Sequence, residues 1–453
     1  MTAPTRILSW NIENFGENSP GTSTPKHMRN EYQAYVLGVI KAVQPHIIVL
    51  VEIAGTKNGQ LIDNHAACLD LQAKLAKEDS NWRLIPPFNC GGNGGVAMLY
   101  LALDPSGRKR FFTGPKFSQG NKPGDSPPPG RPQKDVSFGK NYARKVVGER
   151  KLDPCVTTYL QQVRGIANPP EYENSAAPQT SLGLRASYQK NKIKPSDAVR
   201  DPYRARFVEV ENDQVTRELN IIGVHGPASG DQQDYLRRLA GLKDVATPVV
   251  ASEARVLIGD FNLDSIDDLP DKQGGYHALI TPSSPGSQKY ELALDPSSHL
   301  GQLNQKDGSR DYFVTIIRGK DKATWGPGNQ EESPYPGFRY IDRKPMQKTN
   351  KMVTALDNAF TAHGANAKPN PGANGPSIVN AVAGSPYRPF KNNGQLPTGH
   401  FTMGRLVELP PPSGDQAPED PKPPVGTEED VFRKSYEARV RSISDHLPIV
   451  IEV

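Results

Sequence analysis

The chain has 453 residues, a length that fits one large domain or several smaller ones. Its 43 Pro and 41 Gly form about a fifth of the sequence, above the usual share of roughly 12%, so long loops are expected. The 54 Lys and Arg residues against 49 Asp and Glu give a net charge of +5. This small excess permits a polyanionic partner without requiring one.

Cysteine content and the length of apolar runs indicate in which compartment the protein is found. Cys68, Cys90 and Cys155 are odd in number and lack CxxC spacing, which argues against a disulfide framework or structural zinc. We expect no secretion leader, because no basic n-region, apolar h-region or cleavage site stands before the first predicted strand. No run reaches the roughly 20 apolar residues of a membrane span. We expect a cytoplasmic protein, or a secreted one if an export signal was removed; the sequence predicts no oligomeric state.

Hydrophobic periodicity predicts strands and helices in a mixed order. In chain order these are strand 6–12, helix 31–43, strand 46–53, helix 65–77, strands 82–86 and 95–103, strands 205–210 and 219–225, helix 232–245 and strand 255–260. The Gly-rich turn between the strands at 82–86 and 95–103 predicts a hairpin. Because helices alternate with strands and hairpins are interspersed, we expect an α/β (α+β) fold of mixed sheets with helices outside.

Three segments rich in Pro, Gly and polar residues interrupt this pattern, near 104–140, 165–200 and 364–430. We therefore predict one domain over residues 1–453 with three loop insertions. The second ends in a basic cluster, comprising Arg185, Lys190, Lys192, Lys194, Arg200, Arg204 and Arg206. It is either a solvated loop or a wall that faces phosphates.

Polar residues that directly follow apolar strands are the candidates for chemistry. Glu52 ends the apolar run 47–51, where burial of a carboxylate is costly unless it is paired or bound to a cation such as Mg²⁺. Asp260 and Asn262 follow a second apolar strand and, two residues apart, face the same side. Asn11 and Glu13 end the first strand, although either alone is compatible with a turn former or a solvated acid.

Further candidates precede or end other apolar stretches. Asp445 and His446 stand before the last predicted strand, Asp357 precedes a short apolar stretch, and His225 ends the strand at 219–225. Two histidines among several carboxylates provide groups that take a proton from water and give one to a leaving oxygen. A lone Asp-His pair occurs often by chance, so it indicates a catalytic site only in combination with the other motifs.

Taken in order, these motifs resemble the endonuclease/exonuclease/phosphatase superfamily, in particular its deoxyribonuclease I-like members. The motifs are Trp-Asn-Ile-Glu-Asn-Phe from Trp10, the strand-end Glu52, Val-His at His225, Gly-Asp-Phe-Asn from Gly259 and Ser-Asp-His-Leu-Pro from Ser444. The resemblance implies a four-layer α/β/β/α sandwich with two mixed sheets. It also implies a cofactor, Mg²⁺ or Mn²⁺.

The resemblance implies metal and phosphate ligands. Glu52 would be the main metal ligand, Asp445 would complete the carboxylates on the metal side, and Asn11 and Glu13 would position metal or phosphate. Arg200 would hold a phosphate oxygen, with Arg204 or Arg206 as alternatives.

The resemblance also implies the catalytic roles. Asp260, Asn262 and His446 would hold the attacking water and the scissile phosphate, while Asp357 would orient the His446 ring. His225 would donate to the leaving group or stabilise the phosphorane. Deoxyribonuclease I has a Glu that supports this histidine, whereas the matching positions here are glycines, Gly94 and Gly95.

Three functions follow from these residues. The leading hypothesis is a nuclease that hydrolyses DNA, or RNA, by in-line attack of water on phosphorus, with nucleic acid as substrate and partner. The alternative is a phosphatase or phospholipase C-like esterase acting on lipid or soluble phosphate esters. Asn358 and Ala359 follow Asp357 where the inositide 5-phosphatases have Cys-Asp-Arg, which weighs against that branch. An inactive binding module is the remote alternative.

Overall fold

The structure is a computed structural model, and the part of the chain that it describes consists of residues 4–16, 30–54, 66–90, 94–113, 135–136, 151–169, 171, 179–182, 184, 199–227, 232–263, 276–282, 284–294, 310–313, 316–317, 338–341, 353–354, 356–367, 377–380, 407–408, 446 and 448–453.

Within the described residues, the first sheet has seven strands in the order β18-β17-β19-β1-β2-β4-β3. Their bounds are β1 Arg6–Phe15, β2 Ile47–Ile53, β3 Trp82–Asn89, β4 Gly95–Leu101, β17 Ser377–Asn380, β18 Val407–Glu408 and β19 Ile449–Glu452. The central pair β1 and β2 is parallel, whereas β19 joins β1 and β4 joins β2 antiparallel. The sheet is therefore mixed, and the predicted hairpin of β3 and β4 is confirmed by their antiparallel pairing.

The second sheet has eight strands in the part of the chain that the structure describes, with the path β11-β16-β10-β9-β8-β7-β6 and β5 paired to β8. Their bounds are β5 Lys109–Phe112, β6 Asp135–Val136, β7 Gln179–Ser181, β8 Tyr203–Glu211, β9 Gln214–His225, β10 Glu253–Asp260, β11 Glu291–Leu292 and β16 Asp357–His363. Strands β9 and β10 are parallel, and β8 and β16 flank them antiparallel. Small two-stranded sheets pair β12 Arg310–Phe313 with β14 Phe338–Ile341 and β13 Ile316–Ile317 with β15 Val353–Thr354.

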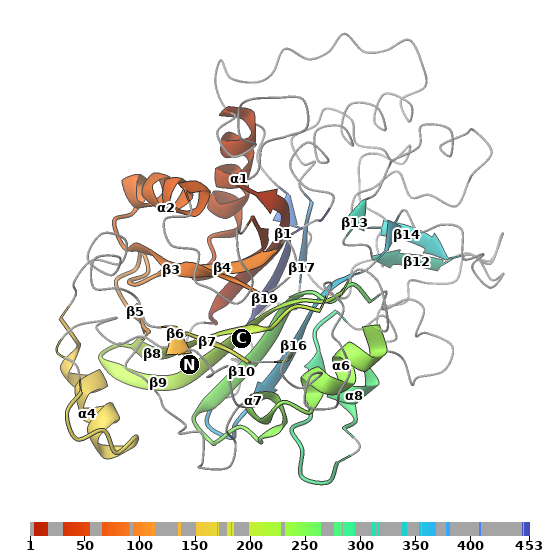
Figure 1. Ribbon diagram of the computed structural model, residues 1–453. Helices are drawn as coiled ribbons and strands as arrows, with labels where there is room; N and C mark the ends of the chain where they lie inside the picture. The colour runs from red at the N-terminus through yellow and green to blue at the C-terminus, as the bar shows by residue number, and fades with distance from the viewer. Residues whose placement is uncertain are drawn as a thin grey trace, which may run out of the picture.

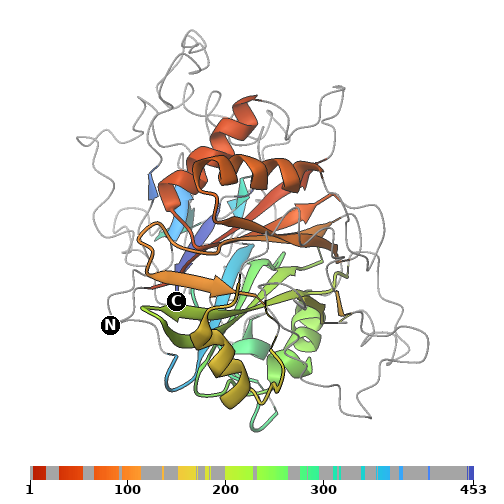
Figure 2. The ribbon, with the colours of Figure 1, turned by 90° about the vertical axis from the view of Figure 1, so that its left-hand side faces the viewer.

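Helices cover the outer face of each sheet (Figures 1 and 2). Among the described residues, the helices are α1 Asn30–Val43 and α2 Ala66–Glu78 over the first sheet, and α4 Pro154–Gln162, α6 Gln232–Ala240, α7 Lys243–Ala246 and α8 His277–Ile280 over the second. Apolar side chains fill each junction: Val49 and Phe207 belong to the cluster between the sheets, and Leu71 to the cluster beneath α2. Burial of this apolar surface is what holds the four layers together.

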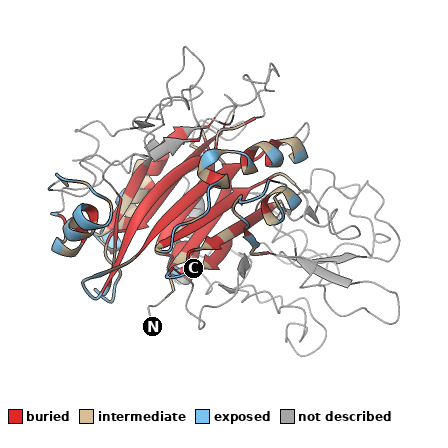
Figure 3. Cartoon of the chain, turned by 90° about the horizontal axis from the view of Figure 1, so that it is seen from below, coloured by how far each residue is buried: buried red, intermediate tan, exposed pale blue. Residues whose placement is uncertain are grey.

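The predicted four-layer α/β/β/α sandwich is confirmed by this arrangement. Figure 3 shows that the strands of the central sheets are buried along most of their length, while the exposed positions lie on helices and turns. Strands β2 and β4 are buried on both faces, which explains why their sequences are nearly continuous apolar runs. Within the described residues, no helix is both long and apolar enough to cross a membrane.

Two local predictions differ from the structure. The predicted helix 232–245 is two helices, α6 and α7, because Leu242 is extended with φ −65° and ψ 135° directly after Gly241. Glycine weakens a helix interior and is common where a helix ends. The segment near 104–140 is not loop throughout: β5 pairs with β8, and Lys109 is buried beside Glu209 with a 3.1 Å ion pair.

Candidate active site

The candidate residues meet because six strands end or begin at one edge of the sandwich. Strands β1 and β2 run parallel in one sheet and β9 and β10 in the other, so each pair presents its carboxyl ends together. Strands β16 and β19 run antiparallel to these neighbours and begin at the same edge. In the second sheet Asp260 is thus flanked by His225 on one side and Asp357 on the other.

Three candidate residues have left-handed backbones, which side chains other than glycine rarely adopt. The φ angle is 46° at Glu13, 62° at Glu52 and 53° at Asn262. Each stands at or beside a strand end, where a left-handed backbone interrupts the regular alternation of side chains along the strand. Such strain costs about 1–3 kcal/mol per residue and persists only when the surroundings enforce it.

The Asp260 carboxylate lies at the centre of the site and is 1% exposed. Its Oδ2 accepts hydrogen bonds from the amides of Asn11, at 2.9 Å, and Asn262, at 3.1 Å, and so joins the two sheets. Its Oδ1 accepts from the backbone N–H of Asn262 at 2.7 Å. Burial raises the pKa of Asp260 above its ordinary value, and nearby carboxylate charges add to this effect, while the two histidines oppose it.

His446 is held on the other side of Asp260. Its Nδ1 lies 2.7 Å from Oδ2 of Asp357, a buried contact that fixes the ring. Its Nε2 then lies 3.3 Å from the Asn11 amide nitrogen and 3.8 Å from Oδ2 of Asp260. The backbone carbonyl of His446 accepts from the Trp10 indole at 3.0 Å, which anchors the segment to β1.

His225 of the second sheet and Glu52 of the first form another contact between the two sheets. Nε2 of His225 lies 3.4 Å from Oε1 of Glu52 and 3.7 Å from Oδ2 of Asp260. Burial alone would raise the pKa of Glu52, but hydrogen bonding to His225, the His225 and His446 charges and the Asn11 amide outweigh it. The pKa of Glu52 consequently lies well below its ordinary value, and the side chain is ionised at neutral pH.

Two glycines, Gly226 and Gly94, lie in the same site. From the sequence, Gly226 had no role, and Gly94 counted only as a position that lacks a Glu. The Gly226 carbonyl accepts from the Arg200 guanidinium at 2.7 Å and from the Asn262 amide at 3.0 Å. A Cβ at Gly226 would lie 2.2 Å from the Phe261 carbonyl oxygen, so only glycine fits. A Cβ at Gly94 would lie 3.1 Å from Nδ1 of His225 and 3.6 Å from Nε of Arg200.

The space at Gly94 is polar. Within the described part of the chain, the buried atoms Nδ1 of His225 and Nε of Arg200 have no hydrogen-bond partner. Buried polar atoms are usually hydrogen-bonded, so their orphaned state fits a site that receives a polar ligand. Gly94 has no side chain that could donate a hydrogen bond, so what it contributes is space. A motif of polar residues does not display such a contribution.

Two groups of ligand atoms fit a metal ion. Glu52, His225 and Asp260 form one, and Asp260, Asp357 and His446 form the other, each with its ligand atoms within 4.8 Å of one another. Mg²⁺ and Mn²⁺ prefer carboxylate oxygens and accept imidazole less readily, so the carboxylates of Glu52 and Asp260 suit them best. The donor chemistry therefore fits the cofactor that the motifs predict.

Most of the predicted site residues come together here, and the exceptions are specific. Glu13 lies two residues before the end of β1, and its backbone N–H donates to Oδ1 of Asn11 at 3.1 Å, but among the described residues it belongs to neither ligand group. Asp445 and the basic residues 185–194 lie outside the described residues. Arg200 lies beside His225, whereas Arg204 and Arg206, the predicted alternatives to it, turn to Asp244 on the outer face of the sheet.

The fold and the site define a class: a four-layer sandwich with a carboxylate and histidine centre at one edge, similar to the endonuclease/exonuclease/phosphatase superfamily. No protein-family model matches the chain, and no curated protein matches it. Among solved structures, the chain is similar to TDP2 of D. rerio complexed with single-strand DNA product, at 9% identity and a TM-score of 0.38, covering 100% of this chain and 99% of that one.

Two other solved structures are similar to a comparable degree. One is an endonuclease/exonuclease/phosphatase family protein from Leptotrichia buccalis, at 11% identity and a TM-score of 0.38, with 99% and 98% of the two chains covered. Another is the mannosyl-6-phosphatase Bt3783 of Bacteroides thetaiotaomicron, at 11% identity and a TM-score of 0.32, with 79% and 98% covered.

Proposed function

We propose that the chain is a divalent-metal-dependent phosphodiesterase whose substrate is nucleic acid. The observation that carries this proposal is the position of Asp260, a fully buried carboxylate shared by both groups of ligand atoms and hydrogen-bonded across the two sheets to Asn11. An uncompensated carboxylate in such a place is costly, so a cation that neutralises it is expected there.

The chain's own residues then divide the work of hydrolysis. Asp260 and Asn262 orient the attacking water, and His446 presents Nε2 to the phosphate because Asp357 holds its Nδ1. Arg200, anchored on the Gly226 carbonyl, donates to a non-bridging phosphate oxygen. His225 stands at the leaving oxygen. Glu52 and Asp260 would hold Mg²⁺ or Mn²⁺, which would supply neutralisation of the phosphate charge and polarisation of the phosphorus centre.

The choice of nucleic acid over other phosphodiesters is supported by charge. The chain has a net charge of +5, and its basic cluster includes Arg200, which contacts the site. Phosphate contacts by Lys and Arg supply the sequence-independent part of nucleic-acid binding. A phosphatase or phospholipase C-like activity at the same centre would use the same groups on a different ester.

One assay separates these substrates. Supercoiled DNA, linear DNA, RNA and phosphoinositides are each incubated with the full chain and Mg²⁺, Mn²⁺ or EDTA. We expect cleavage of nucleic acid only with metal, and its loss in Asp260→Asn and His446→Ala. Free phosphate from a lipid without any nucleic-acid cleavage would contradict the nuclease proposal, and cleavage that survives both substitutions would contradict the site assignment.

A further inference from the structure

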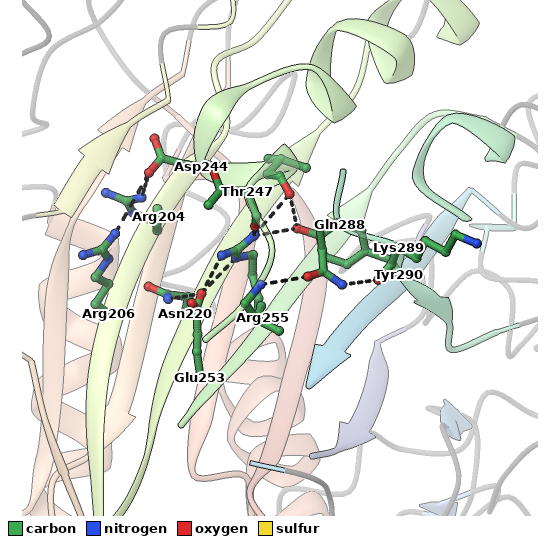
Figure 4. Close-up of polar contacts among 12 residues, drawn as sticks. Arg204, Arg206, Asn220, Asp244, Thr247, Glu253, Arg255, Gln288, Lys289 and Tyr290 are labelled. Carbon is green, nitrogen blue, oxygen red and sulfur yellow. Dashed lines mark hydrogen bonds and ion pairs between the residues drawn. The ribbon is translucent and has the colours of Figure 1, made fainter. Parts of the chain in front are cut away.

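A buried guanidinium group needs an acceptor for each of its nitrogens, and Arg255 on the outer face of the second sheet has them (Figure 4). Its Nε and Nη2 donate to Oε1 of Glu253 at 3.0 and 2.8 Å, and its Nη1 donates to the Thr247 carbonyl at 2.7 Å. Arg200 at the candidate active site differs. Its Nη1 donates to the Gly226 carbonyl at 2.7 Å, but its Nε is buried and, among the described residues, has no hydrogen-bond partner.

The two histidines of the candidate active site differ in a similar way. Nδ1 of His446 lies 2.7 Å from a carboxylate oxygen of Asp357, which fixes that ring. Nε2 of His225 lies 3.4 Å from Glu52, but its Nδ1 is buried and has no hydrogen-bond partner in the part of the chain that the structure describes. The bond made by one ring nitrogen sets the tautomer and orientation of a histidine. His225 therefore lacks the kind of support that His446 has.

Both of these nitrogens face Gly94. A Cβ at Gly94 would lie 3.1 Å from Nδ1 of His225 and 3.6 Å from Nε of Arg200, so one small group beside Gly94 can contact both. A separation of 3.1 Å is crowded for a carbon atom, whereas it is an ordinary hydrogen-bond length for an oxygen. Glycine also permits a ligand to approach the backbone closely. The space beside Gly94 consequently suits the oxygens of a small ligand and excludes bulky groups.

The charge of Arg200 indicates that this ligand is an anion. The acceptor of its Nη1 is a neutral backbone carbonyl, which does not compensate the guanidinium charge. A carboxylate provides two oxygens, one for each donor, and hydrogen bonds between charged partners are about twice as strong as neutral ones. The planar guanidinium group also matches the geometry of a carboxylate. A water molecule in the same place would leave the charge uncompensated.

From this combination we infer that the space beside Gly94 is a binding site for a small carboxylate anion such as formate. One of its oxygens accepts from Nδ1 of His225, and the other accepts from Nε of Arg200. The bound anion supports the His225 ring as Asp357 supports His446, and it keeps Nε2 of His225 directed at Glu52. The effect on catalysis rests on the proposed function, whereas binding of the anion does not.

Binding is measured first, without metal or substrate, from the NMR line broadening of ¹³C-formate by the full chain. We expect saturable binding that weakens at least about tenfold in Gly94→Ala, which fills the space, and in Arg200→Met, which removes a charged donor. Gly38→Ala is the matched control and should bind as the wild type does, because among the described residues nothing lies within 4 Å of its Cβ position. Absence of saturable binding to the wild type, or unchanged affinity in Gly94→Ala or Arg200→Met, overturns the inference.

The size of the anion provides a test that needs no variant. Trimethylacetate has the same charge as formate and is too bulky for the space, so it should not displace ¹³C-formate from the wild type. Equal displacement by trimethylacetate and by unlabelled formate would contradict a narrow site beside Gly94.

Steady-state cleavage of nucleic acid by the metal-loaded chain then measures the effect on His225. Compared with trimethylacetate at equal ionic strength, formate should raise kcat about tenfold in the wild type, with little change in KM, and leave Gly94→Ala unchanged. A rise in KM without a rise in kcat would assign the space to the substrate and overturn the inference. Site-specific formate binding in a chain that cleaves no phosphate ester would contradict the proposed function and leave the anion site established.

Discussion

The carboxylate of Asp357 lies 2.7 Å from Nδ1 of His446, and this contact aims the opposite ring nitrogen at Asn11 and Asp260. Asp357 begins β16, whereas His446 precedes β19 in the other sheet. The pair therefore depends on the packing of both sheets and on residues 89 positions apart in the chain. Its geometry makes the orientation of the histidine testable by itself.

Asp357→Asn should lower kcat by about 10² to 10³, with little change in KM, because the amide no longer favours the required ring tautomer and charge. Steady-state kinetics on a soluble phosphodiester measure both constants. Asp213→Asn is the control, since that side chain is 84% exposed and pairs with Arg110 far from the site. A kcat for Asp357→Asn equal to that of the control would contradict the orienting role.

Two substitutions at Asn262 distinguish the contribution of its side-chain amide from that of its left-handed backbone. Asn262→Gly should change the free energy of unfolding by less than about 1 kcal/mol, because glycine relieves the φ of 53° while two hydrogen bonds are lost. Asn262→Ala should destabilise by about 1–2 kcal/mol, since it loses the bonds and keeps the strain. Urea unfolding measures the two, and both variants should lose at least about tenfold in kcat. Full activity in Asn262→Gly would show that the amide has no part in the reaction.

Gly94→Ala tests the narrow space beside His225. The added Cβ at 3.1 Å from Nδ1 displaces the ring or occupies the polar space, so kcat should fall about tenfold. Gly38→Ala in α1 is matched to it, because among the described residues nothing lies within 4 Å of its Cβ position. The control should keep full activity and gain about 0.5–1 kcal/mol of stability. Unchanged activity in Gly94→Ala would mean that this space is not used.

His46 predicts a pH dependence of stability that is separate from activity. Its Nδ1 accepts the backbone N–H of Arg6 at 3.0 Å, which requires an unprotonated Nδ1. Burial, with the charge of Lys109, lowers the pKa of His46 from 6.5 to about 4. Between these values the unfolded chain binds a proton that the folded chain does not, so stability falls as the pH is lowered through this window.

The expected loss between pH 7 and pH 5 is about 2 kcal/mol for this residue, at about 1.4 kcal/mol per pKa unit. Urea unfolding at both pH values measures the decrease in the free energy of unfolding. The wild type should lose about 2 kcal/mol more than His46→Gln, because Gln does not titrate and its amide oxygen accepts the same N–H. An identical change in the two proteins would show that His46 is not the titrating group.

The sequence predicted the site where a polar residue interrupts a long apolar run. Glu52 and Asp260 stood out for this reason, since a carboxylate after a buried strand needs a partner. Gly226 did not, because its contribution is a backbone carbonyl and the absence of a Cβ, which no motif of polar residues displays. Arg200, Arg204 and Arg206 look alike in sequence, but Arg204 and Arg206 lie on β8 and pair with Asp244, whereas Arg200 precedes that strand and donates to the Gly226 carbonyl.

The fold was predictable to a similar extent. Hydrophobic periodicity found the central strands and the helices that cover them, because apolar burial determines both. The strand β5 was missed, since its Lys109 and Arg110 make it look like loop until Glu209 and Asp153 are known to pair with them. Pairing between residues distant in sequence is a property of the folded chain, and local patterns do not contain it.

The metal requirement of cleavage is the most direct test of the proposed activity. Plasmid nicking by the full chain is measured against Mg²⁺ concentration after EDTA treatment, for the wild type and for Glu52→Gln. We predict no nicking in EDTA, full recovery with Mg²⁺, and a requirement for at least about tenfold more Mg²⁺ in Glu52→Gln, which loses an anionic ligand. Nicking that proceeds at the same rate in EDTA, or the same Mg²⁺ dependence in both proteins, would contradict a metal-dependent centre at Glu52.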